Sequence, residues 1–483
     1  MGSLGMKGRR GRGRVAGAML GAVLLAGTAL AARPESVWAV SVGGPAHDKA
    51  RGIATDREGN VYVTGEFSQT AQFGKHTLVT HGALDFFVAK FDRKGECLWA
   101  RAGGGSLTDR GYAVAADRDQ NCYVTGHYQS VDARFEARGP LPNRGQYDIF
   151  VACYDRLGAL KWIHTGGGAR SDVGHGLALD GRGNCYITGG LAGKGVFGDW
   201  QVEDQRGTHM FLLKFAPDGR QLWGRASRGG SSSGQGMTAD RDGNTWVTGD
   251  IAGEVDYGGA RRSVPGDDMV LVKFDKQGQA LWAAGGEGNS GGIGTGVSVD
   301  ATGAAYVGAW FKTTETVGSE VMRTFGMYDV FTAKFDAEGK PVWARQAGGP
   351  TIDYCEGTIP DGRGGCYAVG CFHDGADFQG VVRHSEGNFD LYMAHYDASG
   401  KLADFLQEGG PGLDEAYCVA RTGKSEAVMS GAYSGVSRYG GGLLTCAGSN
   451  DVVVQQVRLK SNEPTASPPG TAPAPCGSAG HCR

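Results

Sequence analysis

The sequence predicts an all-β fold: a seven-bladed β-propeller of four-stranded antiparallel blades, closed by the N-terminal strand completing the last blade. Three observations lead to this prediction. Segments like DREGNVYVTGEF, residues 56–67, recur at intervals of 60 to 63 residues, which is typical of a repeat architecture. Each repeat contains two alternating hairpin patterns, and none contains a helical pattern of comparable strength. The chain also begins with a strand that its last repeat lacks.

The second repeat shows the expected elements in order. GYAVAAD and NCYVTGHY, residues 111–117 and 121–128, form the first hairpin, strands a and b. DIFVACYD and LKWIHTGG, residues 148–155 and 160–167, form the second, strands c and d. The seventh repeat stops after strand c at residues 451–460, and residues 36–44 supply a separate strand d. Pairing these two strands would leave no bare sheet edge.

One large aromatic side chain falls in each strand d, followed in every repeat by a glycine pair. Because the placement recurs in every repeat, packing between blades explains it better than sugar stacking does. The residues are Trp38, Trp99, Trp162, Trp223, Trp282, Trp343 and Phe405.

The ends of the chain differ from the repeats. Residues 1–31 join a basic segment to a short apolar run with small residues at Ala29 and Ala31, which predicts a secretory signal peptide. The propeller is expected over residues 36–460 and a disordered, proline-rich tail over residues 461–483. Without the signal the formal net charge is about −8, which argues against a nucleic-acid partner. We therefore expect a monomer exported to the periplasm, cell surface or extracellular space, without a transmembrane anchor.

The repeat pattern also carries a family resemblance. W-A-x-x-x-G-G, then A-x-D-x-x-G-N-x-Y-V-T-G, then D-x-F-V-A-K-F-D-x-x-G resembles the bacterial seven-bladed β-propeller repeat family, often called SBBP repeats, over nearly the whole chain after the signal. The resemblance implies an exported propeller and brings no catalytic motif. The fourth and fifth repeats depart most, with Ser232 and Gly292 where other repeats have aspartate.

Acidic residues suggest two different sites. The aspartates between strands a and b lack the later ligands of a calcium loop, and Asp-Gly-Asn chemistry of this kind favours a hairpin turn. A more promising row begins strand a: Asp48, Asp109, Asp172, Asp353 and Asp414. A second row begins strand c: Asp85, Asp148, Asp268, Asp329, Asp390 and Asp451. Both rows should lie on one side of the propeller, where they would hold calcium or another divalent cation, or accept backbone N–H groups in their own turns.

Three other features complete the candidates. Glu66, His127 and Asp250 end their b strands and break the repeat symmetry, as a reaction centre must, but nothing in the sequence orients them as a catalytic set. The longest connection, from Gln129, is a candidate partner-binding element, and its candidate contacts are Arg134, Phe135, Arg138 and Arg144.

The cysteines allow one pairing prediction. Eleven cysteines follow the signal. Cys355 and Cys371 should lie directly opposite each other on neighbouring strands and form a disulfide, if the turn pairs Asp361 with Gly365.

Together these features favour a non-catalytic binding or scaffold module for protein or glycan partners, with no required cofactor. The alternative is a metal-dependent hydrolase or lyase with its site on the acidic face. Fold alone does not decide between them.

Overall fold

The computed structural model describes residues 34–203 and 206–459. Within these ranges all regular elements are β-strands, and no helix is long and apolar enough to cross a membrane. The predicted signal, residues 1–31, and the predicted tail from Ser461 lie outside the described residues.

Each repeat folds into four main strands that pair antiparallel in the order a, b, c, d. The a strands are β2 (Asp48–Thr55), β8 (Asp109–Ala116), β13 (Val173–Leu179), β19 (Arg228–Ala239), β23 (Ile293–Val299), β29 (Asp353–Pro360) and β33 (Asp414–Arg421). The b strands are β3 (Val61–Phe67), β9 (Cys122–Tyr128), β14 (Cys185–Ala192), β20 (Thr245–Asp256), β24 (Ala305–Phe311), β30 (Cys366–Phe378) and β34 (Glu426–Tyr433).

The second hairpin of each repeat supplies the outer strands. The c strands are β6 (Asp85–Phe91), β11 (Asp148–Tyr154), β17 (Thr208–Phe215), β21 (Arg261–Phe274), β27 (Asp329–Phe335), β31 (Val381–Tyr396) and β37 (Asp451–Arg458). The d strands are β7 (Cys97–Gly104), β12 (Leu160–Gly168), β18 (Gln221–Ala226), β22 (Ala280–Gly285), β28 (Pro341–Gly348), β32 (Leu402–Glu408) and β1 (Glu35–Val42).

Shorter strands lie in the connections between strands b and c. They are β4 (Thr70–Phe73), β5 (His76–Val79), β10 (Arg134–Phe135), β15 (Gly195–Phe197), β16 (Trp200–Val202), β25 (Thr314–Val317), β26 (Glu320–Arg323), β35 (Val436–Tyr439) and β36 (Gly442–Thr445). Two of these strands pair with the end of strand d in the preceding repeat, β10 with β7 and β15 with β12, and the end of the long b strand β30 pairs with β28 in the same way. Neighbouring repeats are therefore linked by backbone hydrogen bonds as well as by side-chain packing.

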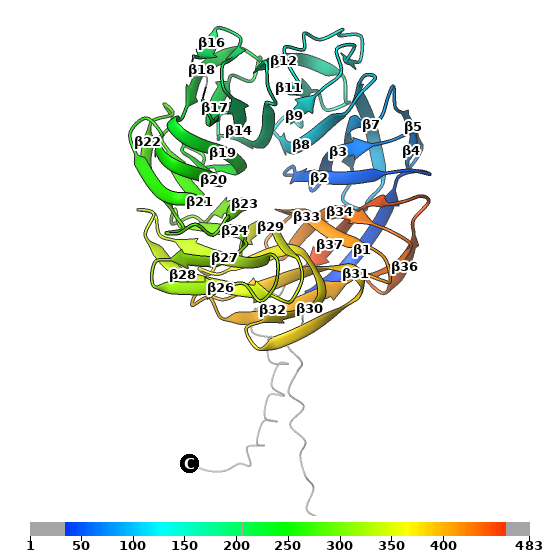
Figure 1. Cartoon of the computed structure of the whole chain (residues 1–483). Helices are drawn as coiled ribbons and strands as arrows, with labels where there is room; N and C mark the ends of the chain where they lie inside the picture. The colour runs from blue at the N-terminus through cyan, green and yellow to red at the C-terminus, as the bar shows by residue number, and fades with distance from the viewer. Residues whose placement is uncertain (1–33, 204–205, 460–483) are drawn as a thin grey trace, which may run out of the picture. The chain divides into compact units, whose positions relative to one another are not determined.

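The two ends of the repeat region meet in one sheet. β1 pairs antiparallel with β37, with Val40 opposite Val454 and Val42 opposite Val452. The a strands also contact one another in sequence, and the last of them, β33, contacts β2. Figure 1 shows the sheets following one another around a central space, with β2, β8, β19, β29 and β33 at its edge.

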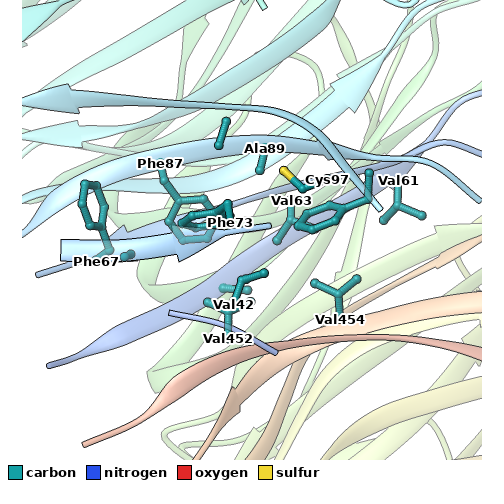
Figure 2. Packing of buried hydrophobic residues seen from close by; sticks show 14 of the residues in the cluster. Val42, Val61, Val63, Phe67, Phe73, Phe87, Ala89, Cys97, Val452 and Val454 are labelled. Atoms are coloured by element: carbon teal, nitrogen blue, oxygen red, sulfur yellow. The ribbon is translucent and has the colours of Figure 1, made fainter. Parts of the chain in front are cut away.

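The hydrophobic core lies between the sheets of neighbouring repeats. In Figure 2, Val452 and Val454 on β37 lie across from Val63 on β3 and Phe87 on β6, and all four are fully buried. The fully buried aromatic and β-branched residues of strands b and c account for this packing, because both faces of each inner sheet are covered.

The strand d tryptophans join one repeat to the next, as predicted. The Trp99 indole Nε1 donates a hydrogen bond to the carbonyl of Arg156 at 3.1 Å, in the turn between strands c and d of the following repeat. A Cβ on Gly158 in that turn would lie 2.8 Å from the indole, so the turn needs glycine. The same bond to the following repeat is made by Trp38, Trp162, Trp282 and Trp343.

Candidate functional site

A cavity of about 490 Å³ lies at the centre of the repeats, and its wall contains residues from all seven a strands. Each a strand has a register shift against its b strand at an equivalent position, for example between Ala50 and Gly52 on β2, and β19 has a second shift between Gly229 and Ser231. A β-bulge of this kind re-aims the extra side chain, and bulges are common beside functional sites. The extra residue of the bulge that all seven a strands share lines the cavity.

The bulge residues are chemically unlike one another although they share one place in the repeat. All seven are half-buried, and only tyrosine occurs twice. They are Arg51, Tyr112, His175, Gln235, Thr295, Glu356 and Tyr417. The rest of the repeat is regular, so this position supplies the asymmetry that recognition of one particular ligand requires.

Arg51 is held in place from behind. Its Nε and one terminal nitrogen donate to the two carboxylate oxygens of Glu66 at 2.5 and 2.7 Å. Glu66 is fully buried, which disfavours its charged form, yet the Arg51 guanidinium lowers the pKa of Glu66 to about 2. The carboxylate thus stays ionised and fixes the guanidinium at the cavity wall.

Aromatic rings surround this guanidinium. Its carbon lies 5.1 Å from the ring centre of Tyr112 and 6.0 Å from that of Tyr417. Lys49 adds a second cation, with Nζ 4.1 Å from the Tyr417 ring and 3.2 Å from a carboxylate oxygen of Glu415. Arg51 therefore lines the cavity between two tyrosines, and Lys49 lies beside the second of them.

Two histidines beside Tyr112 are uncharged. The His175 ring lies 4.7 Å from the Tyr112 ring, and burial together with Arg51 lowers the pKa of His175 to about 4. His127 lies between Tyr112 and Tyr147, and burial followed by the charge of Arg110 lowers its pKa to about 3. Neither ring nitrogen of His127 has a hydrogen-bond partner within the described residues.

Two carboxyl groups with raised pKa values lie at the cavity: Glu356 lines it, and Asp250 lies behind Gln235. Burial and the Glu415 carboxylate raise the pKa of Glu356 to about 7, against the opposing charges of Lys49 and Arg51. Burial likewise raises the pKa of Asp250 to about 6, although a hydrogen bond with Gln235 opposes it. Around neutral pH these carboxyl groups exchange between their neutral and charged forms.

The sequence singled out Glu66, His127 and Asp250, and the structure places each behind a cavity residue: Arg51, Tyr112 and Gln235, respectively. The bulge residues themselves were not predicted from the sequence. The sequence signal for a bulge residue is a polar or aromatic residue between two small ones, three positions after the first-row aspartate of the same repeat. Examples are A-R-G at 50–52, G-H-G at 174–176 and C-E-G at 355–357. The small neighbours permit close packing of adjacent a strands, and the middle residue projects into the cavity.

The two acid rows meet in pairs at the junctions between repeats. The pairs are Asp451 with Asp48, Asp85 with Asp109, Asp148 with Asp172, Asp329 with Asp353, and Asp390 with Asp414. All these side chains are buried, and within 34–203 and 206–459 no three His, Cys, Asp or Glu side chains form a group that could hold a metal ion.

Backbone groups partner one oxygen of each first-row aspartate. Asp109 Oδ2 accepts the N–H of Gly105 at 2.8 Å, and Asp48, Asp172, Asp353 and Asp414 accept the equivalent glycine N–H. A Cβ on Gly104 would lie 2.7 Å from Oδ2 of Asp109 and 2.7 Å from Oδ1 of Asp85. The glycine pair and both acid rows therefore form one structural motif.

The fifth repeat keeps this motif by substitution. Gly292 stands where the first row would have aspartate, and Glu315 from β25 lies beside Asp268 instead. Ser290 Oγ donates to Glu315 at 2.7 Å and contacts Asp268 at 3.1 Å. Burial and the neighbouring Asp268 carboxylate both raise the pKa of Glu315 above its usual range.

Two other sequence-predicted features, the a–b turn and Phe135, have structural roles. In the a–b turn, Asp56 Oδ1 accepts the N–H of Glu58 and Asn60, which confirms a hairpin turn. In the long connection, Phe135 is fully buried against Phe86 and Phe150, so the expectation that it contacts a partner is corrected.

The arginines of the long connection lie in different surroundings. Arg134 and Arg138 are exposed, and Arg144 pairs with Asp148 at 3.0 Å. Partner binding by these arginines stays a prediction.

The register corrects the expected disulfide. The bulge at Glu356 shifts the pairing by one residue, so Cys371 lies opposite Tyr354 and Cys355 lies opposite Gly370. Successive residues of a strand point to opposite faces, and both thiols are buried and free.

Comparisons with known proteins agree with the repeat architecture. A regulatory protein, FlaEY of Caulobacter vibrioides, is 27% identical over 174 residues, which are 35% of this chain and 18% of that protein. An uncharacterized WD repeat-containing protein, L264 of Acanthamoeba polyphaga mimivirus, is 26% identical over 125 residues, 23% of this chain and 9% of that protein. The matched segments thus span less than a fifth of either relative.

Solved structures show weaker likeness. The quinohemoprotein alcohol dehydrogenase of Comamonas testosteroni covers 92% of this chain and 79% of its own, with 12% identity and a TM-score of 0.41. The match with a polysaccharide lyase, an ulvan lyase, spans 87% of this chain and 96% of that protein, with 11% identity and a TM-score of 0.41. Residues 38–66 match the family described as SBBP, Beta-propeller repeat, and this stretch of the chain is a repeat of that family.

Proposed function

We propose that this chain is an exported seven-bladed β-propeller, closed by β1 on β37, that acts as a non-catalytic binding module. The observation that carries the proposal is the row of seven side chains, of six kinds, at one repeat position around the cavity. A packing role would be met by the same residue in every repeat, as it is for the tryptophans of strand d. A role in recognition requires different groups at defined places.

The cavity favours a glycan over a protein surface as the ligand. Its volume lies within the range of about 300–1,000 Å³ typical of small-ligand sites. Tyrosine faces beside charged, amide and imidazole groups suit a sugar ring, which has an apolar C–H face and hydroxyl groups at its rim. A protein partner would instead contact the exposed connections, including Arg134 and Arg138.

Calorimetric titration of the purified protein with a panel of oligosaccharides tests this proposal. We expect binding that falls about tenfold or more in Tyr112→Ala and Tyr417→Ala. Arg57→Ala is the matched control, because Arg57 lines a separate cavity at the a–b turns, the other end of the same strands. Unchanged binding in both tyrosine variants would exclude the central cavity as the site.

A metal-dependent hydrolase or lyase is the second candidate. The observation in its favour is Glu356, whose pKa of about 7 suits general acid–base catalysis. The acid rows would then hold the cation. Product formation from a bound oligosaccharide, lost in Glu356→Gln while binding persists, would support the enzyme; binding without any turnover would support the binding module.

A further inference from the structure

Three cations lie at or beside the central cavity although the chain as a whole is acidic, and one of them, Arg51, lines it. Lys49 and Arg51 lie on β2, and Arg110 lies on β8. Their side chains are 17%, 21% and 30% exposed, so a ligand can reach them while much of their hydration is already removed. Charges in such partly buried positions interact more strongly than they do in water.

The nearby carboxylates do not fully neutralise these cations. Arg51 takes both oxygens of Glu66, and Lys49 lies 3.2 Å from Glu415. Arg110 Nε is 3.7 Å from the already occupied Glu66 and has no hydrogen-bond partner within the described residues. Glu66 and Glu415 thus serve three cations, and Glu356, whose pKa of about 7 leaves it only partly ionised at neutral pH, adds less than one full negative charge. Arg110 keeps donor capacity for an anion.

The neighbouring groups leave this excess charge in place. His127 and His175 have lowered pKa values and add no charge of their own at neutral pH. Tyr112 and Tyr417 lie on either side of Arg51 and present ring faces beside the cations. A sugar ring on either tyrosine would bring its substituents next to Lys49 or Arg110.

We propose that the cavity binds an acidic saccharide, whose carboxylate or sulfate lies against Arg110 and Lys49 while its ring packs on Tyr112 or Tyr417. This inference rests on the proposed glycan-binding function. Arg51, already paired with Glu66, acts as the positioning residue between the two tyrosines. The Arg110 side chain, which is 30% exposed, donates to the anion.

Titration with three probes of equal length tests the inference: an oligogalacturonate, a sulfated oligosaccharide and a neutral gluco-oligosaccharide. We expect an acidic probe to bind at least about tenfold more tightly than the neutral one at low salt, with the difference shrinking at high salt. Arg110→Gln should abolish the preference, and Arg110→Lys should keep part of it. Arg57→Gln, at the other cavity, should change nothing.

The outcomes separate this inference from the function on which it rests. Equal binding of all three probes, or an unchanged preference in a folded Arg110→Gln variant, would overturn the acidic specificity and leave glycan binding intact. Absence of binding to every saccharide would overturn both. Preference for only one acidic probe would support the inference and identify the anion as carboxylate or sulfate.

Discussion

Arg51 at the cavity wall and Glu66 on the neighbouring strand are joined by two hydrogen bonds, 2.5 and 2.7 Å long, with the carboxylate fully buried. Removing the guanidinium would leave an uncompensated buried charge, which typically costs about 3–5 kcal/mol. Since Arg51 is itself partly exposed, we expect Arg51→Ala to lower the free energy of unfolding by about 2 kcal/mol. Chemical denaturation measures this change.

The double variant Arg51→Ala with Glu66→Ala serves as the control. Because neither charge then remains, it should be less destabilised than the sum of the two single variants. Additive losses would show that the pair is not coupled.

Buried aspartate pairs predict an unusual dependence of stability on pH. Burial raises the pKa of Asp48 and Asp353 to about 7, and the charges of Asp451 and Asp329 contribute in the same direction. Between pH 4 and 7 the folded state therefore binds more protons than the unfolded state, whose aspartates have pKa values near 3.8. This contribution is fully present below pH 3.8 and is lost as the pH rises through 7.

We accordingly expect the melting temperature to fall between pH 5 and pH 8, and to fall less in the double variant Asp48→Asn with Asp353→Asn. Asp218→Asn, in an exposed turn, is the control and should leave the slope unchanged. A melting temperature that rises over this interval would contradict the prediction.

The cation predicted for Asp48, Asp109, Asp172, Asp353 and Asp414 has a direct test. Thermal unfolding is measured after chelation and after adding calcium, manganese or zinc singly. If a cation is bound, one metal should raise the melting temperature, and Asp109→Asn and Asp172→Asn should abolish that increase. If the aspartates only accept hydrogen bonds from the glycine N–H groups, none of the three metals should change the melting temperature.

Gly104 should tolerate no side chain. Its Cβ would lie 2.7 Å from carboxylate oxygens of both Asp85 and Asp109, so Gly104→Ala must displace a buried pair. We expect a loss of about 2–3 kcal/mol in the free energy of unfolding. Gly423→Ala is the control, since nothing lies within 4 Å of a Cβ there. Equal stability of the two variants would show that the packing of Asp85 and Asp109 does not require glycine at position 104.

Glu356 should make ligand binding depend on pH. The groups facing it are Glu415 and Tyr417 on β33, and Lys49 and Arg51 on β2. Its neutral form removes a negative charge from the cavity, so an acidic saccharide should bind several-fold more tightly at pH 6 than at pH 8. Glu356→Gln should bind equally at both pH values; a variant that keeps the full pH dependence would place its origin elsewhere.

The repeat period, the strand order and the structural role of the strand d tryptophans could all be predicted from the sequence. Each depends on local features that recur: hairpin turns, alternating apolar residues and one aromatic residue per repeat. The acid rows were also visible, because each begins a strand. The contacts of these aspartates could not be predicted, because Asp109 meets Asp85 of the preceding repeat across the glycine pair.

The chain by itself therefore determined a β-repeat protein with aspartates at fixed strand ends. Only the tertiary structure decided which side chains face one cavity and which cysteines lie opposite. One bulge per a strand turns Arg51, Glu356 and their counterparts inward, and the same bulge moves Cys355 out of register with Cys371. A one-residue shift reverses the face of every side chain beyond it. That shift depends on pairing with a neighbouring strand, which residue spacing within one strand does not specify.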